Sequence, residues 1–152
     1  MVRTESASNL PDVQLQNLFQ QCRLFIETRF PSEAEVGAAA VLVDDGVILL
    51  GTSPDFPNPA TQLCHEAEPI LAAYRLDKLI KASVCLFRSY TGEFVVMSPC
   101  GVCCERLAAF GPNVQVAVPD TDKADVDWVQ LREVIPYYWR TVFDDGAGWG
   151  RR

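Results

Sequence analysis

Two short cysteine motifs carry the side chains in this sequence that are best suited to chemistry. Cys100 and Cys103 form a C-x-x-C pair, and Cys64 begins a C-x-E motif 36 positions earlier. Both motifs fall at expected helix starts, where free N–H groups and the helix dipole favour thiolates. Three thiolates on one zinc leave its fourth position to water, whose pKa then falls toward neutrality. Glu66, the acid of the second motif, is then the expected catalytic group that moves protons.

The C-x-x-C pair by itself has other interpretations. Cys100 and Cys103 are also compatible with two buried structural thiols or with a redox pair. His65, the only histidine, is a rival for the ligand role of Cys64. That alternative requires an acid at the second position after the histidine, where the chain has Ala67.

The other acid and the other cysteines near these motifs have simpler roles. Glu68 is a rival to Glu66, but it suits the first turn of a helix, where the dipole favours an acidic side chain. Cys22 and Cys85 lie in apolar runs and are predicted to be core residues. Cys104 is expected to be structural, with competition for the metal as the alternative.

Hydrophobic periodicity predicts one α/β domain over residues 1–152, with flexible ends at 1–10 and 144–152. Apolar positions between Leu15 and Thr28 predict an amphipathic helix that Pro31 ends. Two continuous apolar runs around an Asp-Asp-Gly turn predict a hairpin of a sheet covered on both faces. The remaining expected elements are, in order, an irregular loop (Thr52–Gln62), a helix (about Leu63–Leu79), two strands (Ser83–Tyr90 and Glu93–Ser98), a helix (Cys100–Phe110), a strand (Val114–Val118) and a helix (Trp128–Ile135). Strands interleaved with helices favour a sheet with helices on both faces.

Charge and composition narrow the class of partner. The net charge is −7, with 13 basic and 20 acidic residues, which argues against a surface for nucleic acid or for anionic membranes. A free small molecule is therefore the expected partner. The sequence has no apolar run long enough for a membrane helix and no apolar run of a secretory signal, so we expect a cytoplasmic protein. In that compartment six cysteines are better interpreted as ligands or thiols than as disulfides.

The combined pattern C-x-E…P-C-x-x-C matches the signature of zinc-dependent nucleobase deaminases. The chain resembles the cytidine deaminase family, in the branch that acts on free nucleosides. The matching segments are VGAAAVLV, LCHEAEPI, MSPCGVCCE and LREVIP, which follow the family order between about residues 20 and 140.

The resemblance implies a three-layer α/β/α sandwich around a five-stranded mixed sheet. It also implies one zinc per subunit and a homo-oligomer, a tetramer or a dimer, whose pockets are completed by neighbouring chains. The implied reaction is hydrolytic removal of the C4 amino group from a cytosine-type ring in a free nucleoside, a nucleoside analogue or a base. A deaminase similar to blasticidin-S deaminase is a close alternative. A structural zinc protein, or a family member that binds a ligand without turnover, is the alternative of another class.

Several positions depart from the family pattern. The family often has an arginine after the second C-x-x-C cysteine, where it donates to the thiolates, but this chain has Cys104. Arg106, Arg88 and His65 are the candidate replacements.

The substrate-contacting positions also differ. Alignment on the segment Val36–Ala39 makes Ala39 a candidate contact and puts Ala34 where the family has a phenylalanine. The segment Ser53-Pro54-Asp55 replaces the Asn-x-Glu that binds the sugar, so Ser53 and Asp55 are candidate contacts, with Phe56 as a possible aromatic wall. Tyr137 and Trp139 are candidates to cover the pocket, with packing or an oligomer interface as the alternative.

Overall fold

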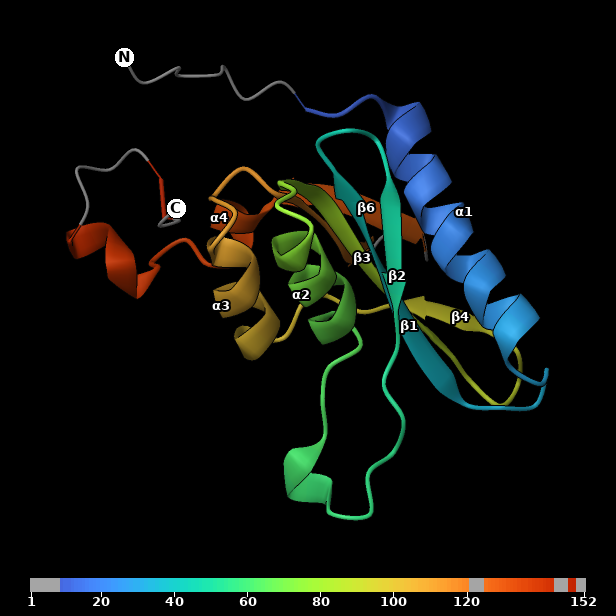
Figure 1. Ribbon diagram of the computed structural model, residues 1–152. Helices are drawn as coiled ribbons and strands as arrows, with labels where there is room; N and C mark the ends of the chain where they lie inside the picture. The colour runs from blue at the N-terminus through green and yellow to red at the C-terminus, as the bar shows by residue number, and fades with distance from the viewer. Residues whose placement is uncertain (1–8, 121–124, 144–147, 150–152) are drawn as a thin grey trace.

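The protein is described by a computed structural model that covers residues 9–120, 125–143 and 148–149. A mixed sheet forms the middle layer, with α1 (Asp12–Arg29) on one face and α2 (Ala67–Arg75) and α3 (Gly101–Ala108) on the other (Figure 1). The expected three-layer α/β/α sandwich is confirmed. The expectation of flexible ends falls mainly on residues 1–8, 144–147 and 150–152, which lie outside the described residues.

Helix α1 forms where the apolar periodicity predicts it. Leu15, Leu18, Cys22 and Ile26 repeat at steps of three and four and are buried against the sheet. The helix ends at Arg29 because Phe30, which precedes Pro31, takes an extended conformation.

The expected hairpin joins β1 (Val36–Val43) to β2 (Ile48–Gly51) in antiparallel register. Gly46 supplies the positive φ of the turn, at 84°, and Asp45 Oδ1 accepts a hydrogen bond from Val47 N. Seven of the eight β1 residues are buried, because α1 packs on one face of the strand and α2 on the other. The continuous apolar run of β1 reflects this double coverage.

The sheet has the strand order β2-β1-β3-β5-β6, and a short sixth strand pairs with β3. Strand β3 (Ile80–Arg88) is parallel to β5 (Gln115–Asp120), and the other pairs are antiparallel, so the sheet is mixed as expected. The sixth strand is β4 (Phe94–Val96), which turns back on β3. The expected five strands are therefore present, and the short strand β4 is added to them.

The expected helix over Trp128–Ile135 is wrong in its first half. Residues Asp125–Gln130 form strand β6, and the helix α4 covers only Leu131–Val134. Trp128 faces the α1 side of the sheet while Val129 packs on the α2 side, the alternation of a strand. A capping box starts the helix at Gln130, whose backbone N–H donates to Glu133 Oε2 at 2.7 Å.

The two helices that carry the cysteine motifs begin later than expected. Helix α2 starts at Ala67 instead of near Leu63, and α3 starts at Gly101. Helix α2 ends at Arg75, before Asp77 adopts a left-handed φ of 53°. Residues Thr52–Gln62 form the expected loop, with a single 3₁₀ turn at Pro59–Thr61. None of the described helices has both the length and the apolar character needed to cross a membrane.

Candidate metal and catalytic site

Three sulfurs from two separate segments meet at the N-terminal ends of α2 and α3. The Sγ atoms of Cys64, Cys100 and Cys103 all lie within 4.8 Å of one another. Cys64 Sγ and Cys100 Sγ are 3.3 Å apart, although these residues are 36 positions apart in the chain. Cys64 occupies the turn before α2, where its carbonyl accepts a hydrogen bond from Ala67 N, and Cys100 is the N-cap residue of α3.

This sulfur group fits a zinc ion. Tetrahedral zinc with Zn–S bonds of about 2.3 Å requires sulfurs about 3.8 Å apart, and the observed separations, 3.3 Å for one pair and no more than 4.8 Å for any pair, are compatible with that value. The third sulfur also distinguishes the site from a simple dithiol pair. The sequence prediction that Cys64 joins the C-x-x-C cysteines in one cluster therefore agrees with the geometry.

The protonation of these thiols depends on their places in the fold. Burial and the nearby Glu66 carboxylate raise the pKa of Cys103 well above its usual range. For Cys100, burial raises the pKa, but backbone N–H groups at the start of α3 and the neighbouring thiols outweigh it, and its pKa falls. The N-terminal end of α3 thus favours a thiolate at its first position.

Glu66 lies beside the sulfurs and is itself buried. It is the N-cap residue of α2, its side chain is 5% exposed, and Cys103 Sγ lies 3.4 Å from its Oε2 atom. Burial raises the pKa of the Glu66 carboxyl, and Arg106 and Cys103 oppose the shift. A carboxyl with a raised pKa beside a candidate metal site is suited to both accepting and donating a proton.

His65 lies against the start of β1 and does not belong to the sulfur group. Its ring lies against Gly37 at the start of β1, where a Cβ built on Gly37 would come within 2.2 Å of His65 Nε2. The Nδ1 atom is buried and has no hydrogen-bond partner among the described residues. Burial lowers the pKa of this imidazole, and Asp55 partly offsets that effect. His65 therefore lines a neighbouring cavity, and the sulfur of Cys64 lies beside the other two thiols.

The remaining acid and cysteines of these motifs have structural contacts. Glu68 is exposed, and its Oε2 accepts a hydrogen bond from Thr52 N at 3.0 Å, which ties the proline-rich loop to α2. Cys104 Sγ donates to Pro99 O at 3.4 Å, and its side chain belongs to the core between the sheet and α3. Cys22 and Cys85 are buried, and burial raises the pKa of Cys22 to about 12.

A cavity of about 380 Å³ opens next to His65 between the start of β1 and the proline-rich loop. Two of the candidate contacts, Ser53 and Asp55, line it, together with Ala34 and Gly37. Sequence reasoning missed much of its wall, because the side chains come from strand ends and loops without a motif of their own: Phe30, Glu35, Val36, Gln62, Leu63 and Phe87. Phe30 and Phe87 provide aromatic surface in the cavity where Ala34 does not.

The other candidate contacts lie elsewhere in this chain. Ala39 is fully buried in β1, paired with Gly51 and Cys85. Phe56 lies in the loop, where its backbone N–H donates to Gln62 Oε1 at 3.1 Å, and it is not among the lining residues of the cavity.

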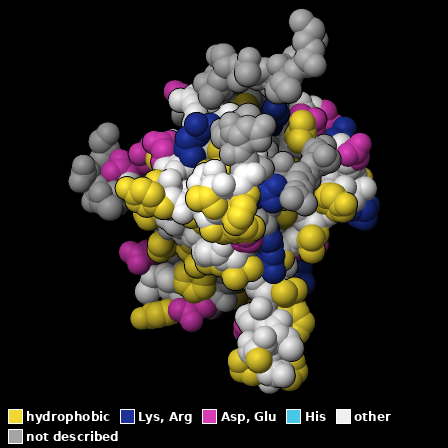
Figure 2. All heavy atoms as spheres, turned by 90° about the vertical axis from the view of Figure 1, so that its left-hand side faces the viewer, with side chains coloured by type: hydrophobic (Ala, Val, Ile, Leu, Met, Phe, Trp, Pro, Cys, Tyr) yellow, Lys and Arg dark blue, Asp and Glu magenta, His cyan; other side chains and the backbone are white. Residues whose placement is uncertain are grey.

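The C-terminal aromatic residues pack beside α3. Tyr137 is 96% exposed and Trp139 is 57% exposed, whereas Tyr138 between them is buried. Tyr138 Oη and Trp139 Nε1 donate to the two carboxylate oxygens of Glu105, at 2.9 and 3.1 Å. Figure 2 shows hydrophobic side chains across this side of the molecule. Tyr137 and Trp139 do not line the cavity of their own chain.

Comparison with known proteins adds to this geometry. No protein-family model and no curated protein matches the chain. The structure is similar to that of the cytidine deaminase from Bacillus anthracis, with 39% sequence identity and a TM-score of 0.78 over 86% of this chain and 92% of that chain. The cytidine deaminase from Mycobacterium leprae is 21% identical, with a TM-score of 0.63 over 80% of this chain and 97% of that chain, and shares the fold. The cytidine deaminase from Mycobacterium tuberculosis is also 21% identical, with a TM-score of 0.63 over 82% and 96% of the two chains.

The fold and the site define an α/β sandwich that holds three thiols and a buried carboxyl at the ends of two helices. Together with the identity and coverage of the Bacillus anthracis structure, they show that the chain belongs to the cytidine deaminase family.

Proposed function

We propose that this protein is a zinc-dependent aminohydrolase that removes the C4 amino group of a cytosine-type ring in a free nucleoside, a nucleoside analogue or a base. The observation that carries the proposal is the meeting of three sulfurs within 4.8 Å, with the buried Glu66 carboxyl 3.4 Å from one of them. In this assignment Cys64, Cys100 and Cys103 hold the metal, and Glu66 is the catalytic acid–base residue. Family membership makes the same chemistry the leading candidate.

The reaction requires one proton carrier and one activated water. Zinc, when bound, supplies the Lewis acidity that makes water a nucleophile near neutral pH. Glu66 takes a proton from that water and passes it to the ring nitrogen N3 as the water oxygen bonds to C4. Glu66 then carries the proton of the new C4 hydroxyl to the amino group, the C4–N bond breaks as the C4 carbonyl forms, and ammonia leaves. Because burial raises its pKa, Glu66 is suited to taking up and releasing a proton in the same cycle.

The cavity beside His65 is the proposed substrate pocket. Ser53 and Asp55 offer it a hydroxyl and a carboxylate, and its lining among the described residues includes no Lys or Arg. This set suits the hydroxyl or amino groups of a sugar and disfavours a phosphate, so a nucleoside is preferred over a nucleotide. A nucleoside with a modified, amino-bearing sugar, as in blasticidin S, is the alternative substrate that the same groups favour.

A closed structural zinc site is less compatible with the geometry. Such a site requires four protein ligands, and the cluster in the described part of the chain supplies three. Cys104 bonds to Pro99 O and His65 lies against Gly37, so neither completes the set. A redox role for Cys100 and Cys103 would leave the convergence of Cys64 and Glu66 unexplained.

We also propose a cytoplasmic homo-oligomer, a tetramer or a dimer. All six cysteines are free thiols, a state that a reducing compartment maintains. Tyr137 and Trp139 are exposed on the α3 side, where a second copy could bury them or receive them at its pocket. The net charge of −7 supports a small-molecule partner over a nucleic-acid polymer or an anionic membrane.

The test combines metal analysis with a substrate panel. The purified protein is analysed for zinc and then incubated with cytidine, deoxycytidine, cytosine, cytidine monophosphate and blasticidin S while the cytosine absorbance band is followed. We expect one zinc per chain, loss of the band with a nucleoside or its analogue, and little change with the monophosphate. Zinc-free protein, or zinc-loaded protein that turns over none of these compounds, would contradict the proposal.

A further inference from the structure

One side of the proposed substrate pocket comes from a single segment, the turn between α1 and β1. Four residues of this segment line the cavity: Phe30, Ala34, Glu35 and Val36. Residues 31–35 belong to no helix or strand, and a hydrogen bond from Ala34 N to Pro31 O, at 3.1 Å, closes the turn. A segment with so little backbone bonding of its own opens easily unless other parts of the fold hold it. The position of this pocket wall therefore depends on contacts from outside the turn.

Arg88, the last residue of β3, lies behind this wall. In the register of the sheet it is paired with Val36, the first residue of β1. Side chains alternate along a strand, so Arg88 lies on the same face as Leu86, which packs against α1. Phe87 lies on the other face and lines the cavity. Arg88 is 4% exposed, so it places a buried charge at the end of an apolar row of β3 side chains.

The Arg88 guanidinium is bound to two carbonyls of the turn. Its Nε and Nη2 atoms donate to Ala34 O at 3.4 and 3.3 Å, and Nη2 also donates to Pro31 O. No carboxylate of the described residues lies within ion-pair distance of Arg88. A buried charge is costly unless it is paired or hydrogen-bonded, so the carbonyls of the turn supply what a carboxylate would otherwise supply. The structure thus places Arg88, a candidate donor to the thiolates by sequence, at the turn after α1.

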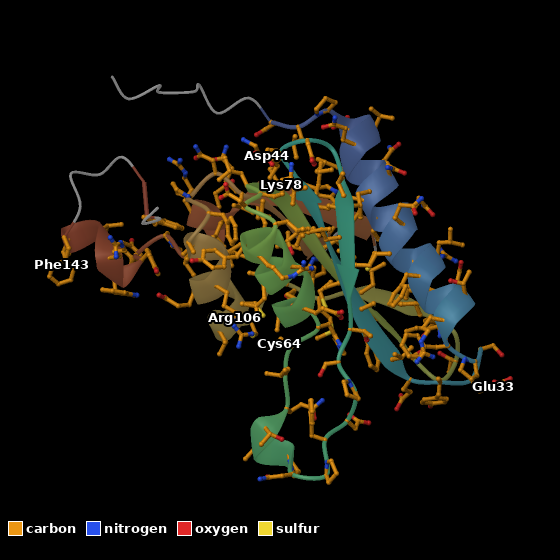
Figure 3. All side chains as sticks on the ribbon, viewed as in Figure 1. Glu33, Asp44, Cys64, Lys78, Arg106 and Phe143 are labelled. Atoms are coloured by element: carbon orange, nitrogen blue, oxygen red, sulfur yellow. The ribbon has the colours of Figure 1, made fainter. Side chains whose placement is uncertain are left out.

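This bonding acts at the end of the sheet that carries the proposed active site. Figure 3 shows Glu33, within the turn, just beyond the C-terminal end of α1 and at the same end of the sheet as Cys64. A positive charge near the C-terminal end of a helix is also favoured by the helix dipole. Packing against α1 does not require a guanidinium at this position, whereas bonding to two carbonyls of the turn does.

We propose that Arg88 is a positioning residue of the substrate pocket, whose guanidinium holds the turn between α1 and β1 and thereby the wall formed by Phe30, Ala34 and Glu35. The inference rests on the proposed function, because it takes the cavity beside His65 as the substrate pocket. Arg88 contacts neither the substrate nor the metal in this proposal. Its loss weakens substrate binding and leaves the chemical step unchanged.

The variants separate this role from a general effect on stability. Arg88→Met keeps most of the length of the side chain and removes its charge and its donors. Arg88→Lys keeps the charge but lacks the planar fork that reaches two acceptors. Leu131→Ala, which opens a cavity in the core at α4 and lies outside the pocket lining, is the control for lost stability. Arg75→Met, at the exposed end of α2, is the control for lost surface charge.

Two measurements are made on each variant. Hydrogen–deuterium exchange of residues 32–36 in the ligand-free protein reports directly whether the turn is held, and it does not depend on catalysis. Steady-state kinetics give KM and kcat separately for each compound of the substrate panel that the parent protein turns over. Zinc analysis and circular dichroism accompany both measurements.

We expect Arg88→Met to raise KM on the order of tenfold, the size expected for the loss of one pocket contact, with kcat within about twofold of the parent value. Zinc content should stay at that of the parent. Exchange of residues 32–36 should be about tenfold faster or more, because hydrogen bonds from a charged donor no longer oppose the opening of the turn. Arg88→Lys should lie between Arg88→Met and the parent, and both controls should match the parent in KM and in the exchange of this segment.

Parent-like KM and exchange in Arg88→Met would overturn the inference. A fall in kcat or in zinc content at unchanged KM, or an equal rise of KM in Leu131→Ala, would assign Arg88 to general stability and would overturn it as well. If Arg88→Met does not fold by circular dichroism, Arg88→Lys takes its place, and parent-like KM and exchange in that variant would overturn the inference.

The same experiment distinguishes failure of the inference from failure of the proposed function. Each of the contrary results above leaves the proposed function intact, because the parent protein still binds zinc and turns over a nucleoside or its analogue. A parent protein that turns over no compound of the panel would remove the proposed function, and with it the substrate role of the pocket. The exchange measurement would then still decide whether Arg88 holds the turn.

Discussion

Glu66 and Glu68 are two acids on the same short segment with opposite environments. Glu66 is buried beside the sulfurs, whereas Glu68 is exposed and bonds to Thr52 N in the loop. A side chain that shuttles protons in the proposed reaction must lie beside the metal site, and of these two acids Glu66 is the one that lies beside the sulfurs. Because the two acids differ in position, replacing each of them in turn tests which one is catalytic.

We expect Glu66→Gln to lower kcat by on the order of 10²–10⁴-fold or more, because the amide cannot accept the proton of water. Zinc content should stay at one per chain, since Glu66 is not a proposed ligand. Glu68→Gln is the matched control and should keep most of the activity. The measurements are steady-state kinetics by absorbance and zinc analysis of each variant. Parent-like turnover in Glu66→Gln would contradict the catalytic assignment.

Gly37 tests whether the position of His65 matters for the pocket. A Cβ at position 37 would lie 2.2 Å from His65 Nε2 and 2.4 Å from its Cδ2, so the ring must move. Movement of a pocket wall by about 1 Å is enough to cost on the order of 10²-fold in rate. We therefore expect Gly37→Ala to reduce kcat/KM strongly.

The double variant Gly37→Ala/His65→Ala provides the control for this clash. Removing the ring opens the space that the new methyl group needs, so its kcat/KM should match that of His65→Ala alone. If Gly37→Ala had no effect by itself, or if the double variant stayed below His65→Ala, the close contact would not be the cause.

At the scale of elements, the predictions from sequence succeeded where one periodicity dominated. The helix α1 and the strands β1 and β2 carry clear patterns with strong stop signals, at Pro31 and at the Asp-Asp-Gly turn. The prediction of a helix over Trp128–Ile135 was wrong in its first half because the apolar spacing there fits both the period of a helix and the period of a strand. Pairing with β5 and the capping box at Gln130 settle the boundary, and the pairing is a long-range contact that no local pattern reveals.

Helix α1 offers a matched stability test of the layer it forms. Leu18 is fully buried against the sheet, whereas Leu24 on the same helix is 49% exposed. We expect Leu18→Ala to lower the free energy of unfolding by about 2–5 kcal/mol, because it leaves a cavity in the core. Leu24→Ala should cost less than about 1 kcal/mol. Urea unfolding followed by circular dichroism measures both, and equal costs would mean that α1 is not packed as described.

At the scale of the whole molecule, the cluster of three sulfurs could be predicted from the sequence, and the wall of the cavity beside His65 could not. Cys64, Cys100, Cys103 and Glu66 could be named because their spacing has a chemical meaning and each motif adjoins a helix start. The pocket wall instead combines strand ends and loop residues, such as Phe87 and Gln62, whose proximity depends on the sheet order. Ala39 is a candidate contact by alignment with the family, and in this chain it is fully buried in β1.

The outer side of α2, α3 and the C-terminal segment carries exposed apolar side chains that no sequence motif predicts. Leu71 and Tyr74 on α2 are 61% and 77% exposed, and Val142 and Phe143 near the end of the described chain are 78% and 75% exposed. Exposed apolar side chains gathered on one side of a protein usually mark an interaction surface. The outer side of α1 is polar and has fewer exposed apolar side chains. A variant on α1 can therefore serve as a control for variants on the α2 side of the molecule.

We expect the protein to be a homo-oligomer in solution, with this surface buried between copies. Light scattering coupled to size-exclusion chromatography should give a mass two or four times that of the 16.9 kDa chain. The double variant Leu71→Glu/Tyr74→Glu should shift the mass toward the monomer, because it places like charges in a contact that was apolar. Val13→Glu, at a position 70% exposed on α1, should leave the mass unchanged. A parent protein that elutes as a monomer would contradict the oligomer, and a variant that dissociates and loses activity together would indicate that neighbouring copies complete the pocket.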